Sequence, residues 1–198
     1  IIGHGRVASA VEADDVLVIG RAEFAAVKAD HISITGNANI HGDFDGQTFK
    51  LSGTVAVQGD LRAREIVSNG DLQAKTITAH RFFSRGPVKA RSLQADDARI
   101  TIYGRSEIGD IAAKTLEVAN KGVWKMLQNL VGGPSHVLEA EHIEAERVYL
   151  ERTAARTVKG QNVHIGPGCH IDVVEFVDSV FINPEARVRQ TTQRSRHG

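Results

Sequence analysis

The sequence predicts an all-β fold: a right-handed parallel β-helix of roughly ten coils, with about 17 residues per coil and one short helical or loop insert. The first observation is a glycine repeat with steps of 17, 16, 17, 17, 16 and 18 residues, made by Gly3, Gly20, Gly36, Gly53, Gly70, Gly86 and Gly104. The second is a small residue that recurs in the same register, at Ala13, Ala29, Gly46, Ala63, Ala79, Ala95 and Ala113. The third is a short alternation of apolar and polar residues, as in 49–51, which has the period of a half-buried strand.

Apolar residues at fixed offsets from the small residue predict the interior of the coils. Three residues after it come Val16, Ile32, Phe49, Ile66, Phe82, Ala98 and Leu116, and two or three before it come Val11, Val27, Phe44, Leu61, Ile77, Leu93 and Ile111. Since parallel strands lie about 4.8 Å apart, equivalent side chains of successive coils stack into apolar columns. We expect the small residues at one corner, where a bulky side chain does not fit inside. We expect the glycines at another corner, where a left-handed backbone is favourable.

The repeat divides the chain into four parts. We expect β-helix coils at 1–120, an insert at 121–135, further coils at 136–182 and a basic tail at 183–198. Beyond Glu185 the tail contains arginines and no acidic residue, and we expect it to be disordered.

The insert has the apolar spacing of a two-turn helix that is bounded by glycines. Its apolar residues, the expected membrane or partner contacts, are Trp124, Met126, Leu127, Leu130 and Val131. Two helical turns are not stable alone in water, so this apolar face must pack against something. One interpretation is packing on the wall or an end of the β-helix. The other is insertion into a lipid interface, with Lys121 and Lys125 close to anionic headgroups.

The composition argues against several classes of function. Lys and Arg together number 24, as do Asp and Glu, so no overall charge attracts nucleic acid and none is expected as a partner. No Gly-rich loop ends in Lys-Ser or Lys-Thr, so no nucleotide site is expected. The single cysteine, Cys169, favours a reducing compartment. No apolar run reaches the roughly 18 residues of a membrane span and no signal-peptide pattern occurs, so we expect a cytoplasmic protein.

Two stretches carry a likeness to a known family. One is the coil signature Val-Gln-Gly-Asp-Leu-Arg-Ala at 57–63, which is echoed at 40–44 and 108–111. The other is the C-terminal run 145–176, which includes Val-Lys-Gly-Gln-Asn-Val-His-Ile-Gly-Pro-Gly-Cys at 158–169.

On these stretches the chain from about Gly3 to Val188 resembles the bactofilins, the polymer-forming cytoskeletal β-helix proteins of bacteria. Its C-terminal run is similar to a longer, bacillus-type branch of that family. The resemblance implies nucleotide-independent filaments made by end-to-end stacking of β-helices, often at the membrane. The inserted segment and the extra coils are departures from the smaller bactofilins.

The two ends of a β-helix are independent candidates for a functional site. Each end exposes unpaired strand edges and an open apolar cross-section, which pair with another chain unless a cap covers them. We therefore expect polymerisation ends at Ile1, Ile2, Val7, Phe176, Val180, Phe181 and Ile182. The alternative is a monomer or dimer whose terminal segments cover its own ends.

Two patterns containing histidine could suggest chemistry, and both have a simpler interpretation. The stretch 163–171 is similar to the hexapeptide repeat of β-helix acyltransferases, in which a histidine is the general base. Barely one and a half such units occur, which argues against that activity. The spacings His136/His142 and His164/His170 match no structural zinc pattern, so surface histidines are the simpler interpretation.

Paired aspartates are the last candidates for catalysis. Asp14-Asp15 and Asp96-Asp97 follow the small corner residue. Some β-helix polysaccharide lyases use acidic pairs for catalysis, but we expect these two pairs to face solvent. The sequence therefore predicts no catalytic residue, no metal site and no cofactor.

These observations favour a scaffold that works by self-association and not by catalysis. The expected partner is the chain itself, in a homopolymer. A membrane surface and cell-wall or morphogenesis proteins are further candidate partners. We therefore expect a cytoplasmic protein, and membrane binding would place it peripherally at the inner face of the membrane. The main alternative is a discrete adaptor that presents the solenoid wall to a protein partner.

Overall fold

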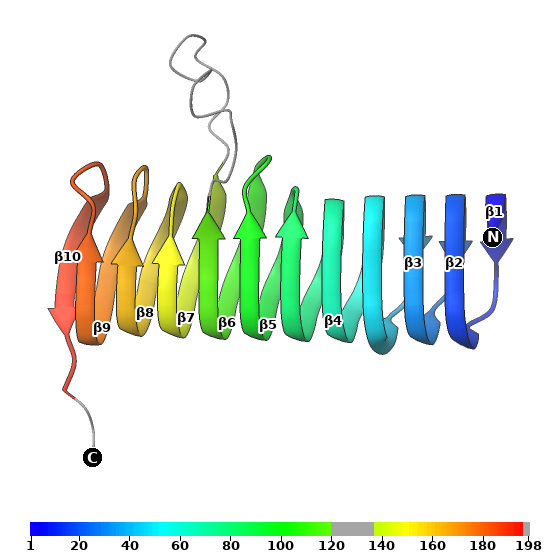
Figure 1. The fold of residues 1–198 in the computed structure, drawn as a ribbon, viewed down its shortest axis with the longest axis horizontal. Coiled ribbons are helices and arrows are strands. Elements are labelled where there is room, and N and C mark those ends of the chain that lie inside the picture. Colours follow the sequence, from blue (N-terminus) through cyan, green and yellow to red (C-terminus); the bar gives the residue numbers. More distant parts are fainter. Residues whose placement is uncertain (120–136, 196–198) are drawn as a thin grey trace, which may run out of the picture.

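A computed structural model describes residues 1–119 and 137–195 as one parallel sheet of ten strands, wound into a β-solenoid (Figure 1). The strands are β1 (Ile2–Val7), β2 (Val11–Phe24), β3 (Val27–Ile40), β4 (Phe44–Arg85), β5 (Val88–Thr101), β6 (Ser106–Ala119), β7 (Leu138–Leu150), β8 (Thr153–Ile165), β9 (His170–Ile182) and β10 (Arg187–Gln193). Each strand pairs with the next in chain order, and the described residues contain no helix.

The β-helix that the repeat predicts is confirmed, with about ten turns of roughly 17 residues each. The insert 121–135, expected to be a loop or short helix, lies outside the described residues. So do its expected contact residues, Trp124, Met126, Leu127, Leu130 and Val131.

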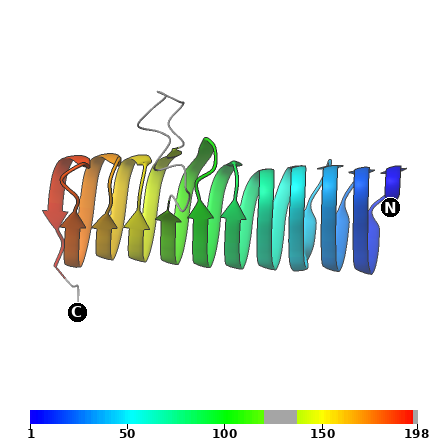
Figure 2. The same ribbon diagram turned by 45° about the horizontal axis from the view of Figure 1, so that its top comes forward.

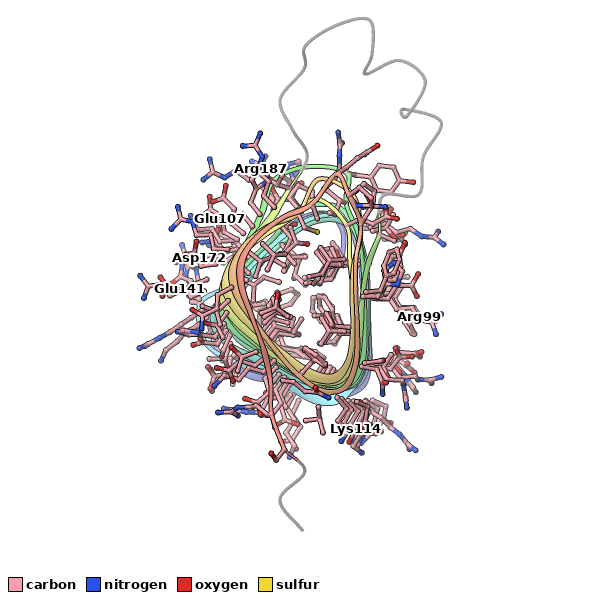
Figure 3. All side chains as sticks on the ribbon, turned by 90° about the vertical axis from the view of Figure 1, so that its left-hand side faces the viewer. Arg99, Glu107, Lys114, Glu141, Asp172 and Arg187 are labelled. Carbon is pink, nitrogen blue, oxygen red and sulfur yellow. The ribbon has the colours of Figure 1, made fainter. Side chains whose placement is uncertain are left out.

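Each coil has three walls and three corners. In the coil that runs from Gly20 to Gly36 the first wall is 21–24, the second wall is 27–29 and the third wall is 31–35. We name the corners after their residues: the glycine corner lies between the third and first walls, the turn corner between the first and second, and the small-residue corner between the second and third. Seen end-on, the walls surround one filled interior, with Glu107 outside the first wall, Lys114 at the small-residue corner and Arg99 outside the third wall (Figure 3).

The interior is a single apolar core made of stacked columns. One column contains Val27, Phe44, Leu61, Ile77 and Leu93, each at most 2% exposed. Aromatic rings interlock between columns, since Phe44 and Phe49 meet edge to face with their centroids 5.1 Å apart. The apolar columns expected from the spacing are therefore confirmed, and their burial is the main source of stability.

Six of the seven repeated glycines lie at the glycine corner with a positive φ, as predicted. Gly20, Gly36, Gly53, Gly70 and Gly86 have φ between +114° and +147°, and Gly3 has φ +93°. At each of those five, a Cβ would overlap the carbonyl oxygen of the glycine one coil earlier. Only glycine tolerates both conditions.

Gly104 was expected as the seventh member of this corner, and that prediction is wrong. Arg85 pairs with Thr101, so Ile102 and not Gly104 follows the stack above Gly86. Gly104 lies in a turn with no positive φ, next to Pro87. The last glycine step of 18 residues comes from a longer corner, not from a continued stack.

The basic tail, expected to be disordered from 183, instead continues the solenoid. Residues 187–193 form β10, which pairs with β9 from Arg187 opposite His170 to Gln193 opposite Phe176. Val188 points inward onto the core, and Arg189 and Arg194 lie 3.2 Å from Asp172 and 3.0 Å from Glu175.

Residues 187–193 form a strand because inward and outward residues alternate at its start. Sequence reasoning missed this alternation because the segment is rich in arginine. Arg187, Val188 and Arg189 alternate outward and inward, as in a half-buried strand. Two acidic residues of β9, Asp172 and Glu175, form ion pairs with Arg189 and Arg194. The C-terminal coils therefore extend beyond 182, which was their expected boundary.

Candidate functional site

One candidate site is the end of the rod formed by β1 and the start of β2 (Figure 2). Val7, Val11 and Val16 pack against the core but are only partly buried, because no described strand pairs with their outer side. Ile1 and Ile2 are 38% and 82% exposed. The expected residues Ile1, Ile2 and Val7 therefore lie at one edge. Sequence reasoning did not include Val11 and Val16, although both begin columns that the repeat had revealed.

The opposite end is formed by residues 178–182 of β9 together with β10. Val180 and Ile182 end two core columns and are partly buried. Phe181 lies between them, points outward and is 51% exposed. These three expected residues lie at the outer edge of the third wall, where the described residues supply no further strand.

Phe176, also expected at this end, lies one coil inside the edge. Gln193 of β10 pairs with it, and the Arg194 amide donates a hydrogen bond of 2.8 Å to its carbonyl oxygen. Phe176 follows Gly160 in the small-residue column, and a register shift between β8 and β9 widens the corner there. In the outer coil, Val188 of β10 lies opposite Ile171 and packs against the core.

The first and second walls carry ladders of charge on their outer surfaces. The outward column of the first wall contains Arg6, Glu23, Asn39, Ala56, Gln73, Lys89, Glu107, Glu139, Ala154, His170 and Arg187. Neighbouring coils form ion pairs, among them Lys28–Glu12 at 3.0 Å and Arg105–Glu139 at 2.7 Å. These side chains are largely exposed, so each pair contributes little to stability. They keep the two walls polar.

The third wall differs because apolar and aromatic residues occur in its outward column. This column contains Leu17, Ser33, Lys50, Val67, Phe83, Arg99, Glu117, Tyr149, His164 and Phe181. Tyr149, His164 and Phe181 form a continuous ring stack, with centroids 4.8 Å and 4.5 Å apart. Arg99 lies over the Phe83 ring, 5.6 Å from its centroid.

An open groove of about 520 Å³ follows the ring stack, lined by Arg147, Asn162 and Ser179 on one side and by the rings on the other. The Tyr149 hydroxyl donates a hydrogen bond of 2.6 Å to a Glu151 carboxylate oxygen. This bond, with partial burial and the negative charge of Glu151, raises the pKa of Tyr149 to about 12. Sequence reasoning missed the stack because these residues are 15 and 17 positions apart, so only the register brings them together.

The structure separates the two histidines of the acyltransferase-like stretch. His164 lies inside the ring stack of the third wall, whereas His170 is exposed on the first wall. His136, from the other spacing considered for zinc, lies outside the described residues. The part of the chain that the structure describes contains no group of three or more His, Cys, Asp or Glu side chains placed to hold a metal ion.

The aspartate pairs lie at the small-residue corner, and the second pair, Asp96-Asp97, forms ion pairs with neighbouring basic side chains. Asp96 accepts hydrogen bonds from Lys114, at 2.9 Å, and from His80, at 2.8 Å, and these bonds lower the pKa of Asp96. Asp97 lies 3.6 Å from Arg99. Asp14 and Asp15 are exposed at the first coil.

Cys169 is a core residue. It is 0% exposed, and its Sγ lies 3.4 Å from the carbonyl oxygen of Leu150. Burial raises the pKa of its thiol to about 11, which suppresses the thiolate form needed for nucleophilic reaction. Across the described residues, no helix is long and apolar enough to cross a membrane.

Comparison with known proteins gives relatives that are themselves uncharacterized. The chain is 36% identical to uncharacterized protein YhbE of Bacillus subtilis (strain 168) over 103 residues, which are 51% of this chain and 42% of YhbE. It is 41% identical to uncharacterized protein YhbF of the same organism over 56 residues, which are 28% of this chain and 24% of YhbF. The matched part thus spans less than half of either relative. No family model matches the chain, and no solved structure matches it.

Proposed function

We propose that this chain is a non-catalytic structural scaffold that assembles end to end into filaments without nucleotide. The observation that carries the proposal is that the core columns run into both end coils and are left partly uncovered there. Val11 and Val16 are the partly buried members at one end, and Val180 and Ile182 at the other. The likeness to bactofilins in the coil signature at 57–63 supports the same function.

Stacking two rods end to end would pair the free backbone groups of the edge strands and bury the apolar side chains of the end coils. An edge strand offers unpaired N–H and C=O groups, and a second edge placed about 4.8 Å away pairs with them. The same contact buries the end valines and Ile182, and each apolar side chain contributes up to about 2 kcal/mol when fully buried. A contact between unlike ends repeats without closure and gives a polar filament. Contacts between like ends give a closed dimer when one end alone self-associates, and a filament without polarity when both ends do.

Negative-stain electron microscopy of the purified chain at two salt concentrations, without nucleotide, tests the proposal. We expect filaments or ribbons a few nanometres wide, and sedimentation velocity should show mass that grows with protein concentration. Uniform small particles at every concentration would overturn the proposal and favour the discrete adaptor.

Two end variants locate the interface. Val11→Lys and Ile182→Lys each place a charge in one open cross-section, and each should stop filament growth while circular dichroism shows the parent β signal. Thr54→Lys on the first wall, far from both ends, is the matched control and should leave filaments unchanged.

Mixing the two end variants shows whether unlike ends or like ends of the rods meet. If unlike ends meet, each variant alone is monomeric, and the mixture forms a dimer through its two unmodified ends. If like ends meet, each variant alone forms a dimer. Filaments that persist in both variants would show that the rods do not associate through these ends.

A further inference from the structure

Most of the exposed apolar residues that the structure describes lie on the third wall. Among the described residues, the large hydrophobic side chains that are exposed are Ile1, Ile2, Leu17, Ile19, Tyr103 and Phe181. Leu17 and Phe181 belong to the outward column of the third wall, and Ile19 lies two residues after Leu17 on the same wall. Ile2 pairs with Ile19, and Tyr103 lines a groove with Phe83 and Arg99 of the third wall. The corresponding column of the first wall contains no large apolar residue.

The third wall also has the shape of an interface. Viewed end-on, its ribbons superimpose along a straight side, marked by Arg99, so successive coils form a flat surface (Figure 3). Ten coils about 4.8 Å apart and a wall about five residues wide give a surface of about 48 Å by about 17 Å. That is about 800 Å², the area that each partner contributes to a standard protein interface.

We propose that the third wall binds the third wall of a second copy of this chain, side by side and antiparallel. The order of residues in the outward column favours a second copy in this orientation. In an antiparallel pair with full overlap, the first member of the column faces the last, which places Leu17 against Phe181 at both ends of the contact. The two-fold axis then passes between Phe83 and Arg99, which face each other across it as a cation–π pair.

The charges of the wall distinguish this orientation from a parallel one. In a parallel two-fold pair each member of the column faces itself, so Lys50, Arg99 and Glu117 would each meet a like charge. In the antiparallel pair Lys50 faces Tyr149, and Glu117 faces Val67. In the neighbouring column of this wall, Arg81 then faces Asp97. Like charges brought together at an interface are costly, so the antiparallel pair is favoured.

Cross-linking with a short bismaleimide tests this contact at a point that end-to-end stacking cannot reach. In a Cys169→Ala background, Phe83→Cys places one thiol in the middle of the third wall, beside the proposed axis. We expect covalent dimers from Phe83→Cys. The matched control is Lys89→Cys, at the same level of the rod but exposed on the first wall, and it should stay monomeric.

Orientation is tested with Lys50 and Tyr149. A mixture of Lys50→Cys and Tyr149→Cys chains should cross-link as a heterodimer, whereas Lys50→Cys alone should not. Homodimers of Lys50→Cys would overturn the antiparallel arrangement. Absence of Phe83→Cys dimers, or equal cross-linking of Lys89→Cys, would overturn the interface itself.

Two further measurements separate this proposal from end-to-end stacking. Adding Val11→Lys and Ile182→Lys should leave the Phe83→Cys dimers intact, since the proposed contact does not use the open ends. Leu17→Glu combined with Phe181→Glu should raise the dissociation constant of the lateral dimer by roughly tenfold or more in sedimentation equilibrium. Flotation of the parent chain with anionic vesicles that also blocks Phe83→Cys cross-linking would identify a lipid surface as the occupant, and would overturn the proposed partner.

Discussion

The solenoid up to Gly86 and the solenoid from Val88 onward turn the same corner in different ways. In the first region the glycine corner is a stack of glycines with positive φ, in direct contact from coil to coil. In the second region the same corner is made of loops between strands, such as 102–105, 151–152 and 166–169, which project from one side of the rod (Figure 1). At this corner β6 ends at Ala119 and the next described strand, β7, begins at Leu138.

The difference shows two ways to close one fold. A glycine stack fixes the coil length at 16 or 17 residues and leaves no space for a side chain. A loop relaxes the length and tolerates an ordinary residue such as Arg152 at φ +47°. Side-chain hydrogen bonds occur at both kinds of corner: the Thr153 hydroxyl donates a bond of 3.0 Å to the carbonyl oxygen of Glu151, and the Ser84 hydroxyl donates one of 3.4 Å to the carbonyl oxygen of Gly86.

The largest effect that we expect comes from adding a methyl group to the glycine stack. Gly53 has φ +135°, and its Cβ would overlap the carbonyl oxygen of Gly36, so Gly53→Ala should destabilise the fold by about 3 kcal/mol or more. Gly168→Ala, in the second region, is the matched control. It also starts from a positive φ, of +72°, but its nearest neighbour is the flexible side chain of Arg152, and about 1 kcal/mol is expected. Chemical denaturation followed by circular dichroism measures both, and equal losses would contradict the distinction between the regions.

The next largest effect that we expect is a difference in stability between insertions at the two kinds of corner. Six Gly-Ser residues placed between Tyr103 and Gly104 extend an exposed turn, and we expect a loss below about 1 kcal/mol. The same six residues placed between Ser52 and Gly53 break the stack and the parallel register on both sides, and the melting temperature should fall by 10 °C or more, roughly the shift for 3 kcal/mol in a chain of this size. Comparable melting temperatures for the two variants would show that the glycine stack does not set the register.

How much the sequence predicts also differs between the regions. Up to Gly86 the period is nearly constant, so the columns could be read directly from glycine and apolar spacing, and the core follows. Beyond it the corner lengths vary, which explains why Gly104 was wrongly placed in the stack. The step from Ser106 to Leu138 across the insert hides the continuation of every column.

The candidate sites were harder to predict than the core for the same reason. Apolar end residues such as Val180 and Ile182 follow from the repeat. Placing Phe176 inside the edge requires the knowledge that 187–193 pairs with β9, and a single inward residue, Val188, is too weak a signal beside the arginines. The ring stack of the third wall depends on registers that cross two loops, so no local pattern reveals it.

A buried hydroxyl at the junction of the two regions should give an intermediate effect. In the first region the Leu72 amide donates to the carbonyl of Pro87, whereas the Val88 amide donates to the hydroxyl oxygen of Ser106 at 3.1 Å. Ser106 is fully buried, so Ser106→Ala leaves that amide unpaired and should cost about 1 to 3 kcal/mol in the free energy of unfolding. Ser92→Ala, at a partly exposed position, is the control and should change stability by less than about 0.5 kcal/mol.

The smallest effect concerns the phenol of Tyr149, which depends on the loop corner of the second region. Its hydrogen bond to Glu151 raises the folded-state pKa to about 12, above the ordinary value of 10.0. Because the folded state holds the proton more tightly, this contribution to stability is complete below pH 10 and is lost as the pH rises from about 10 to about 12. Tyr149→Phe should remove the part of the phenolate absorbance at 295 nm that develops near pH 12, and should flatten the loss of stability across that range. Glu151→Gln, which keeps an acceptor without the charge, should shift that absorbance step to lower pH, and an unchanged step would show that Glu151 does not control this phenol.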